Sequence, residues 1–129
     1  MSKFTWDHIH LRTSDPEGTA KWYESMLGAE VIRTTQQGAP RIDLKLGGAN
    51  IFIAPVKAGD GVNPPPTTPY RGLDHFGLTV TGIDAIAADL KAKGVEFTKE
   101  PVTVRPGVRI CFIRAPEGVS IELLERTPV

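Results

Sequence analysis

Two similar stretches, TWDHIHLR at residues 5–12 and GLDHFGLT at residues 72–79, decide how this chain of 129 residues folds. Each contains Asp-His followed by apolar residues at alternate positions, which is typical of a β-strand with two unlike faces. Each is followed by a segment with apolar residues at helical spacing, and these segments end at Gly28 and Gly94. The chain is therefore predicted to contain a structural repeat.

The remainder of each copy has the pattern of strands. The segments AEVIRT, PRIDLKLG and ANIFIAP follow the first predicted helix, and VEFT, VRICFIRA and VSIELLE follow the second. Two βαβββ modules are expected, at residues 3–56 and 72–126, joined by a linker at residues 57–71 that is rich in Pro and Gly. Because one module alone buries little core, the two sheets are expected to pair within a single α+β domain over residues 1–129.

The overall composition limits the possible classes of function. Fifteen basic residues balance fifteen acidic ones, so no net charge attracts the chain to nucleic acid or to a membrane surface. No apolar run approaches the roughly 20 residues of a spanning helix, and MSKFTWDHIH lacks the apolar core of a signal peptide. The single cysteine, Cys111, cannot form an internal disulfide. We expect a cytoplasmic protein that acts on a small molecule, without nucleic-acid or membrane partners.

The alternation of strand side chains predicts which residues share a face. The apolar residues of the first strand face the helix, which leaves His8 on the opposite face, and His75 takes the same position in the second copy. In the last strand Ile121 and Leu123 face the helix, so Glu122 points the other way. Two histidines and one glutamate are therefore predicted on the sheet faces opposite the helices.

These three residue types together indicate a metal site. Two imidazoles and a carboxylate, from His8, His75 and Glu122, bind one divalent metal ion and leave other coordination positions open. Open positions are typical of catalytic sites, where the ion acts as a Lewis acid. The set accepts Fe, Mn, Ni, Co or Zn, and the sequence does not select one of them.

Further polar residues are predicted on the same face. His10 is a candidate general acid or base, or else a hydrogen-bonding residue that lines the pocket. Arg41 and Asp43, with Arg109 as the predicted match of Arg41 in the second copy, are candidates to bind a carboxylate or phosphate of the substrate. The alternative is that these charges pair with each other.

Three more residues are candidates for the pocket. Phe52 would stack on the substrate or simply fill space, and Tyr70, at the end of the linker, would close over the site. Cys111 is aligned with Asp43 and would lie at the edge of the pocket, but no neighbour in the sequence indicates an activated thiolate.

With these residues the sequence resembles the vicinal oxygen chelate superfamily, which contains glyoxalase I, bleomycin-resistance proteins, extradiol dioxygenases and fosfomycin-resistance thiol transferases. The resemblance extends over residues 5–126 and is carried by DHIHL, KWYESMLGAEVI, LDHFGLTV, GVEF and APEGVSIELLE. It implies that the modules form a half-open barrel around the metal, and that modules pair across a homodimer. Each site would then take His8 from one chain, and His75 with Glu122 from the other.

One position departs from the glyoxalase I pattern. Those enzymes have a fourth protein ligand on the last strand of the first module, where aligning ANIFIAP with VSIELLE places Phe52. A phenyl ring cannot coordinate a metal, so the set of three ligands is more similar to those of extradiol dioxygenases and fosfomycin-resistance enzymes. Bleomycin-binding members generally lack the ligands, so the intact set disfavours a role in binding alone.

The favoured function is that of a glyoxalase-type lyase or isomerase, which chelates vicinal oxygens of a small substrate while Glu122 or His10 moves a proton. One alternative is a nonheme Fe(II) extradiol-type dioxygenase that acts on a catechol-like diol. A Mn(II) thiol transferase is less favoured, because no potassium-binding loop is recognisable. A further alternative is a non-enzymatic protein that sequesters an antibiotic. The substrate is not specified by the sequence.

Overall fold

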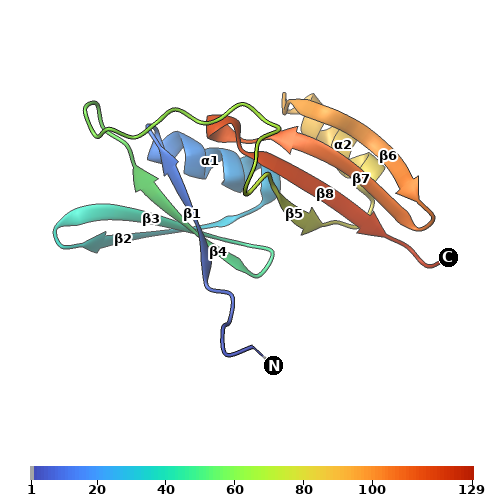
Figure 1. Cartoon of the computed structure of the whole chain (residues 1–129), viewed down its shortest axis with the longest axis horizontal. Helices are drawn as coiled ribbons and strands as arrows, with labels where there is room; N and C mark the ends of the chain where they lie inside the picture. Colours follow the sequence, from blue (N-terminus) through green and yellow to red (C-terminus); the bar gives the residue numbers. More distant parts are fainter. Residues whose placement is uncertain (1) are drawn as a thin grey trace. The chain divides into compact units, whose positions relative to one another are not determined.

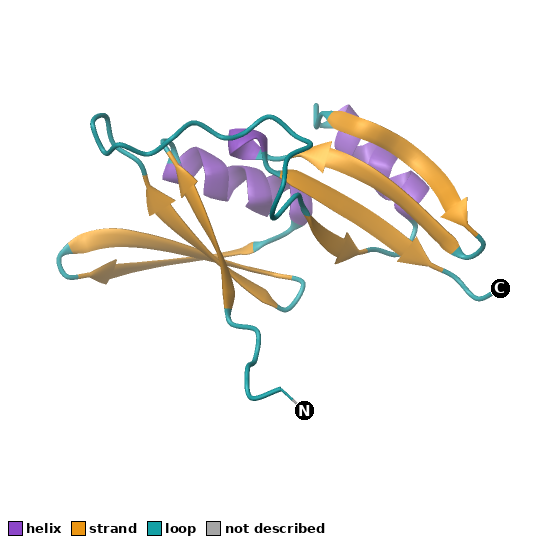
Figure 2. Cartoon of the chain, viewed as in Figure 1, coloured by secondary structure: helices purple, strands orange, loops and turns teal. Residues whose placement is uncertain are grey.

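The computed structural model describes residues 2–129 of a chain that divides into two compact units, Met1–Asn63 and Pro64–Val129. Each unit contains one α-helix and one four-stranded mixed sheet (Figures 1 and 2). This confirms the α+β class and the two βαβββ modules predicted from the repeat. Within residues 2–129, no helix has the length and apolar character needed to cross a membrane.

The first unit runs in the order β1 (His8–Thr13), α1 (Pro16–Leu27), β2 (Glu30–Gln36), β3 (Ala39–Leu46) and β4 (Ala49–Pro55). Its sheet has the order β1-β4-β3-β2, in which β1 is parallel to β4 and the other neighbours are antiparallel. α1 packs against β2, β3 and β4. The buried residues between helix and sheet include Ala20, Tyr23, Leu44, Ile51 and Ile53.

Both ends of α1 are capped locally, and the helix ends at Gly28 as the sequence predicts. The Asp15 carboxylate accepts a hydrogen bond from the Gly18 backbone N–H at 3.0 Å, and Pro16 occupies the first turn. Gly28 ends the helix in the left-handed conformation, and its N–H donates to the Glu24 carbonyl at 3.1 Å. Both ends of α1 are therefore capped by residues next to them in the chain.

The second unit repeats this arrangement with β5 (Phe76–Thr79), α2 (Ile83–Ala92), β6 (Phe97–Arg105), β7 (Val108–Arg114) and β8 (Ser120–Arg126). A short 3-10 turn, Pro116–Gly118, precedes β8. The sheet order is β5-β8-β7-β6 with β5 parallel to β8, and α2 packs against β6, β7 and β8. Its core includes Ile83, Leu90, Ile113, Ile121 and Leu123.

One strand is longer than the sequence predicts. The VEFT segment was expected to end near Thr98, whereas β6 continues to Arg105. This extension contains Pro101 and several irregularities in its pairing with β7. Proline has no N–H to donate to a neighbouring strand and is tolerated at sheet edges, where β6 lies. The presence of Pro101 therefore made this segment look unlike a strand in the sequence.

The start of α2 is stabilised from a distant part of the chain. Gly82, at its N-cap, has no side chain to bind the exposed N–H groups of the first turn. The Glu125 carboxylate of β8 accepts hydrogen bonds from the N–H groups of Gly82 at 2.7 Å and Ile83 at 3.1 Å instead. These two bonds lower the pKa of Glu125 below its usual range. A long-range contact therefore replaces the local cap found in α1.

Candidate metal centre

The second unit brings together two of the predicted ligands, His75 and Glu122. His75 directly precedes β5, and the parallel register of β5 and β8 places Gly77 beside Glu122. On β8, Ile121 and Leu123 are buried on the helix side, so Glu122 projects from the opposite face. His75 Nε2 lies 3.0 Å from Glu122 Oε1. Both side chains are partly exposed, His75 to 30% and Glu122 to 19%.

The other ring nitrogen of His75 also faces a carboxylate. His75 Nδ1 lies 2.8 Å from Asp74 Oδ2. The Asp74 hydrogen bond raises the pKa of His75, partial burial opposes this, and Glu122 adds to the increase. The Phe112 ring meets the imidazole edge-on, with 4.8 Å between centroids, and closes one side of the pair. Two carboxylates around one imidazole form a site that favours a cation.

The geometry of the pair fits a divalent metal ion. Metal bonds to imidazole nitrogen and carboxylate oxygen are about 2.1 Å long. Two such bonds to donors 3.0 Å apart meet at roughly a right angle, as adjacent ligands of an octahedral ion do. Within residues 2–129, no cluster of three or more His, Cys, Asp or Glu side chains is assembled. The third predicted ligand, His8, belongs to the first unit.

The first unit contains a related but different arrangement around His8. His8 Nδ1 lies 2.7 Å from Asp7 Oδ2, so the Asp-His contact occurs in both units. The His8 ring stacks on Phe52, with 4.1 Å between centroids and 24° between planes. The β1–β4 register pairs His10 with Phe52 as the β5–β8 register pairs Gly77 with Glu122. Phe52 thus occupies the position of Glu122, as the aligned sequences predict.

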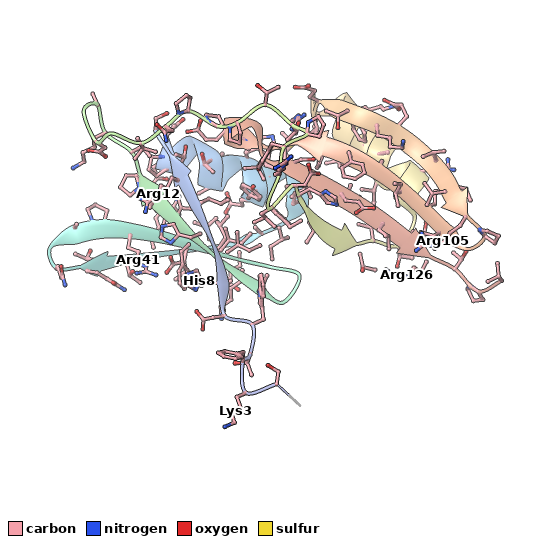
Figure 3. The ribbon with its side chains drawn as sticks, in the orientation of Figure 1. Lys3, His8, Arg12, Arg41, Arg105 and Arg126 are labelled. Atoms are coloured by element: carbon pink, nitrogen blue, oxygen red, sulfur yellow. The ribbon has the colours of Figure 1, made fainter. Side chains whose placement is uncertain are left out.

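The remaining polar residues of the first unit lie around this stack. The Arg41 guanidinium lies over the Phe52 ring, 4.7 Å from its centroid, and pairs with Asp43 at 3.0 Å. Figure 3 labels Arg41 and His8 on the first unit. Arg41 and Asp43 thus pair with each other in the structure, and their role in binding the substrate stays a prediction. The His10 ring centroid is 6.1 Å from that of His8. Burial chiefly, with nearby cations, lowers the pKa of His10.

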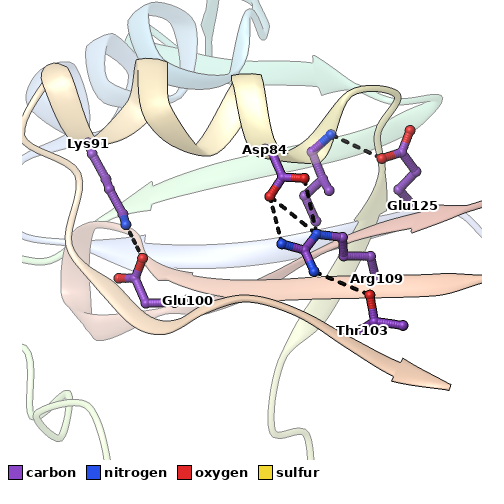
Figure 4. A network of polar contacts seen from close by, with 7 residues as sticks. Asp84, Lys91, Glu100, Thr103, Arg109 and Glu125 are labelled. Atoms are coloured by element: carbon purple, nitrogen blue, oxygen red, sulfur yellow. Dashed lines mark hydrogen bonds and ion pairs between the residues drawn. The ribbon is translucent and has the colours of Figure 1, made fainter.

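The prediction that Arg109 shares the face of His75 is wrong. The β7–β8 register pairs Arg109 with Glu125, on the side of the sheet that α2 covers. Arg109 Nη2 lies 2.8 Å from an Asp84 carboxylate oxygen, and Nη1 donates to the Thr103 hydroxyl (Figure 4). Figure 4 also shows a separate ion pair, between Lys91 of α2 and Glu100 of β6. Arg109 therefore binds helix α2.

The same register corrects the position of Cys111. Asp43 pairs with Phe52, and the residue that pairs with Glu122 is Phe112, so Phe112 and not Cys111 corresponds to Asp43. Cys111 is fully buried, and burial raises the pKa of its thiol to about 11. A contact residue of the metal pair, Phe112, was thus missed in the sequence.

Tyr70 lies exposed in the segment between β4 and β5. Its role in closing over the site stays a prediction.

The fold agrees with comparisons to known proteins. Residues 5–123 match the model of the Glyoxalase/Bleomycin resistance protein/Dioxygenase superfamily. The chain belongs to this superfamily, which confirms the resemblance found in the sequence.

Individual relatives are similar over most of this chain. The protein named "Probable lactoylglutathione lyase, chloroplastic" from Arabidopsis thaliana is 30% identical over 126 residues, which cover 94% of this chain but 35% of that protein. Two further plant relatives are also covered to less than half of their length, 44% each. A lactoylglutathione lyase from Haemophilus influenzae is 26% identical, with 92% of this chain and 90% of the relative covered.

Solved structures show the same fold. A glyoxalase family protein from Bacillus cereus superposes with a TM-score of 0.78 at 19% identity, covering 99% of each chain. At this identity the likeness concerns the fold alone.

Proposed function

We propose that this protein is a metal-dependent lyase or isomerase of the glyoxalase type, acting on a small substrate with neighbouring oxygen atoms. The observation that carries this proposal is the distance of 3.0 Å between His75 Nε2 and Glu122 Oε1, with Asp74 bound to the other ring nitrogen. The similarity to lactoylglutathione lyases supports this class of reaction.

The proposed ligands are His75, Glu122 and His8, which hold one divalent ion. His8 comes from the first unit of the same chain or of a second chain in a homodimer, and the paired modules form a half-open barrel. When bound, the ion acts as a Lewis acid on oxygen atoms of the substrate.

The residues of this chain supply the other steps. The Glu122 carboxylate takes up or returns the proton that moves between carbons of the substrate, and His10 is the second candidate for this transfer. Phe112, which packs on His75, keeps water from one side of the pair. The Arg41–Asp43 pair beside Phe52 is a polar contact for the remainder of the substrate.

The test combines metal content with a specific assay. The protein is loaded with Ni, Zn, Co, Mn or Fe(II), its bound metal is measured, and formation of lactoylglutathione from methylglyoxal and glutathione is followed. We expect one bound ion per site and turnover that is lost in Glu122→Gln. Glu100→Gln, which removes an exposed carboxylate from β6, is the matched control. A protein that binds metal without converting this substrate or related hydroxy-ketones would refute the lyase assignment.

The position of Phe52 favours a second candidate. Because Phe52 stands where glyoxalase I has a fourth ligand, the site also suits a nonheme Fe(II) dioxygenase that cleaves a catechol-like diol. Oxygen consumption with catechols by anaerobically purified, iron-loaded protein would establish this candidate. Absence of bound metal together with micromolar affinity for an aromatic antibiotic would instead establish a binding protein.

A further inference from the structure

The structure repeats one small arrangement in both units, an aspartate bound to the histidine that follows it. Asp74 Oδ2 lies 2.8 Å from His75 Nδ1, and Asp7 Oδ2 lies 2.7 Å from His8 Nδ1. In each case the contact is made by Nδ1. The same ring atom is therefore engaged twice, in two separate units.

The surroundings of the two histidines otherwise differ. His75 meets the Glu122 carboxylate, whereas His8 stacks on Phe52. A contact that is present in both units, while the neighbours have changed, does not depend on either neighbour. It is a local property of the Asp-His sequence at the start of β1 and just before β5.

A carboxylate determines the tautomer of the imidazole that it binds. An ionised carboxylate only accepts hydrogen bonds, so Nδ1 must be the atom that carries the proton. The lone pair of a neutral ring is then on Nε2. In His75 this atom lies 3.0 Å from Glu122 Oε1, so without metal both ring nitrogens face carboxylates that accept hydrogen bonds. A metal ion would take the place of the Nε2 proton, while Nδ1–H stays bound to Asp74. Asp74 thus keeps the proton on Nδ1, so that Nε2 is the nitrogen that can bind the ion.

We infer that Asp74 and Asp7 are positioning residues that fix the Nδ1–H tautomer and the ring orientation of His75 and His8, so that Nε2 of each ring binds the metal. This inference rests on the proposed function, because it concerns the same ion. Carboxylates bound to the outer nitrogen of a metal-binding histidine also increase its basicity, and losing them typically weakens metal binding about 10–100-fold.

The two aspartates are not equivalent. The side chain of Asp74 is 44% exposed and that of Asp7 is 82% exposed. Water and salt weaken the more exposed contact more strongly. The contribution of Asp74 to metal affinity therefore exceeds that of Asp7.

The first measurement is the affinity for Zn(II), obtained by competition with a chromophoric chelator. Asp74→Ala should weaken binding about 10–100-fold. Asp74→Asn should lose less, because its amide oxygen still accepts the Nδ1 hydrogen bond, and Asp7→Ala should lose less than Asp74→Ala. Asp89→Asn, which removes an exposed charge from α2, is the control and should leave the affinity unchanged.

The second measurement detects the tautomer without metal. The chain has three histidines, so long-range ¹H–¹⁵N spectra of the metal-free protein, at a pH where the rings are neutral, contain three assignable imidazoles. In the metal-free wild type Asp74 and Glu122 compete for the ring proton of His75, so we expect a substantial Nδ1–H population. This population should fall toward Nε2–H in Asp74→Ala, where only Glu122 remains, and recover in Asp74→Asn. Unchanged thermal unfolding shows that the variants remain folded.

The results separate this inference from the proposed function. If the wild type binds zinc and Asp74→Ala binds it within twofold, or keeps the same tautomer, the positioning role is refuted and the metal site stands. If the wild type binds no metal, both are refuted.

Discussion

Replacing Tyr23 by phenylalanine is expected to stabilise the first unit. The Tyr23 side chain, on α1, is completely buried, and its ring packs edge-on against Trp22, with 5.1 Å between ring centroids. Among the described residues 2–129, nothing forms a hydrogen bond with its hydroxyl group. Burial also raises the pKa of the phenol above its usual range, so the group is neutral at any pH at which the protein is studied.

The magnitude follows from the hydroxyl group alone. Burying a polar group without a partner costs about 1–3 kcal/mol. Removing the oxygen also loses a few van der Waals contacts worth about 0.1–0.2 kcal/mol each. Tyr23→Phe should therefore raise the free energy of unfolding by about 1 kcal/mol, or the melting temperature by roughly 3 °C. Tyr23→Ala removes the ring as well and should cost about 3–5 kcal/mol.

Urea denaturation followed by circular dichroism measures this difference. The matched control is Tyr70→Phe, because Tyr70 is 39% exposed and its replacement should change stability by less than about 0.5 kcal/mol. A Tyr23→Phe variant that is less stable than the wild type by about 1 kcal/mol, the value of an ordinary hydrogen bond, would show that the hydroxyl group has a partner.

Three further predictions concern the site and the helix that accompanies it. His75→Ala should lose bound metal yet remain folded, since His75 lies outside the core. Elemental analysis measures the metal content and circular dichroism the folding. Stoichiometric metal in the variant would contradict this prediction. Glu125→Gln should destabilise the second unit near neutral pH, because the charged carboxylate binds the start of α2. Because the pKa of Glu125 is lowered in the folded state, this stabilisation is present above the unfolded-state pKa of about 4.3 and is lost as the pH falls through the folded-state pKa. In urea titrations the unfolding free energies of wild type and variant should therefore converge in acid. A difference that stays constant with pH would disprove the assignment. Phe52→Glu places a carboxylate beside His8, as Glu122 stands beside His75. Relative to Phe52→Leu it should tighten Zn(II) binding about tenfold, equal to about 1.4 kcal/mol. Equal affinities of these two variants would exclude Phe52 from the site.

The modules could be predicted because their signals are local and occur twice. Asp-His followed by alternating apolar residues, and a helix that ends at glycine, are patterns within a few residues of one another, and β1 with α1 lies where they indicate. The shared face of His75 and Glu122 also followed from strand alternation, since Ile121 and Leu123 mark the buried side without ambiguity.

The two wrong predictions, for Arg109 and Cys111, concern β7, where buried and partly exposed residues do not alternate strictly. On β7 the neighbours Ile110 and Cys111 are both buried, so apolar residues occupy both faces and the sequence does not determine which face Arg109 takes. On the face that it takes, Arg109 forms an ion pair with Asp84 of α2, and the strand register places it opposite Glu125 of β8. Such partners are distant in sequence, and no local period reveals them.

The source of the cap on α2 affects the order in which the chain can acquire its structure during synthesis. α1 has its cap, Asp15, one residue ahead of it, so its first turn can be completed as soon as that segment leaves the ribosome. α2 begins at Ile83, but the carboxylate that caps its first turn belongs to Glu125, which is synthesised much later. Glu125 lies three residues beyond Glu122 on the same strand. Nascent α2 therefore gains its cap only when the strand that carries Glu122 has docked, which makes helix completion and ligand placement a single event.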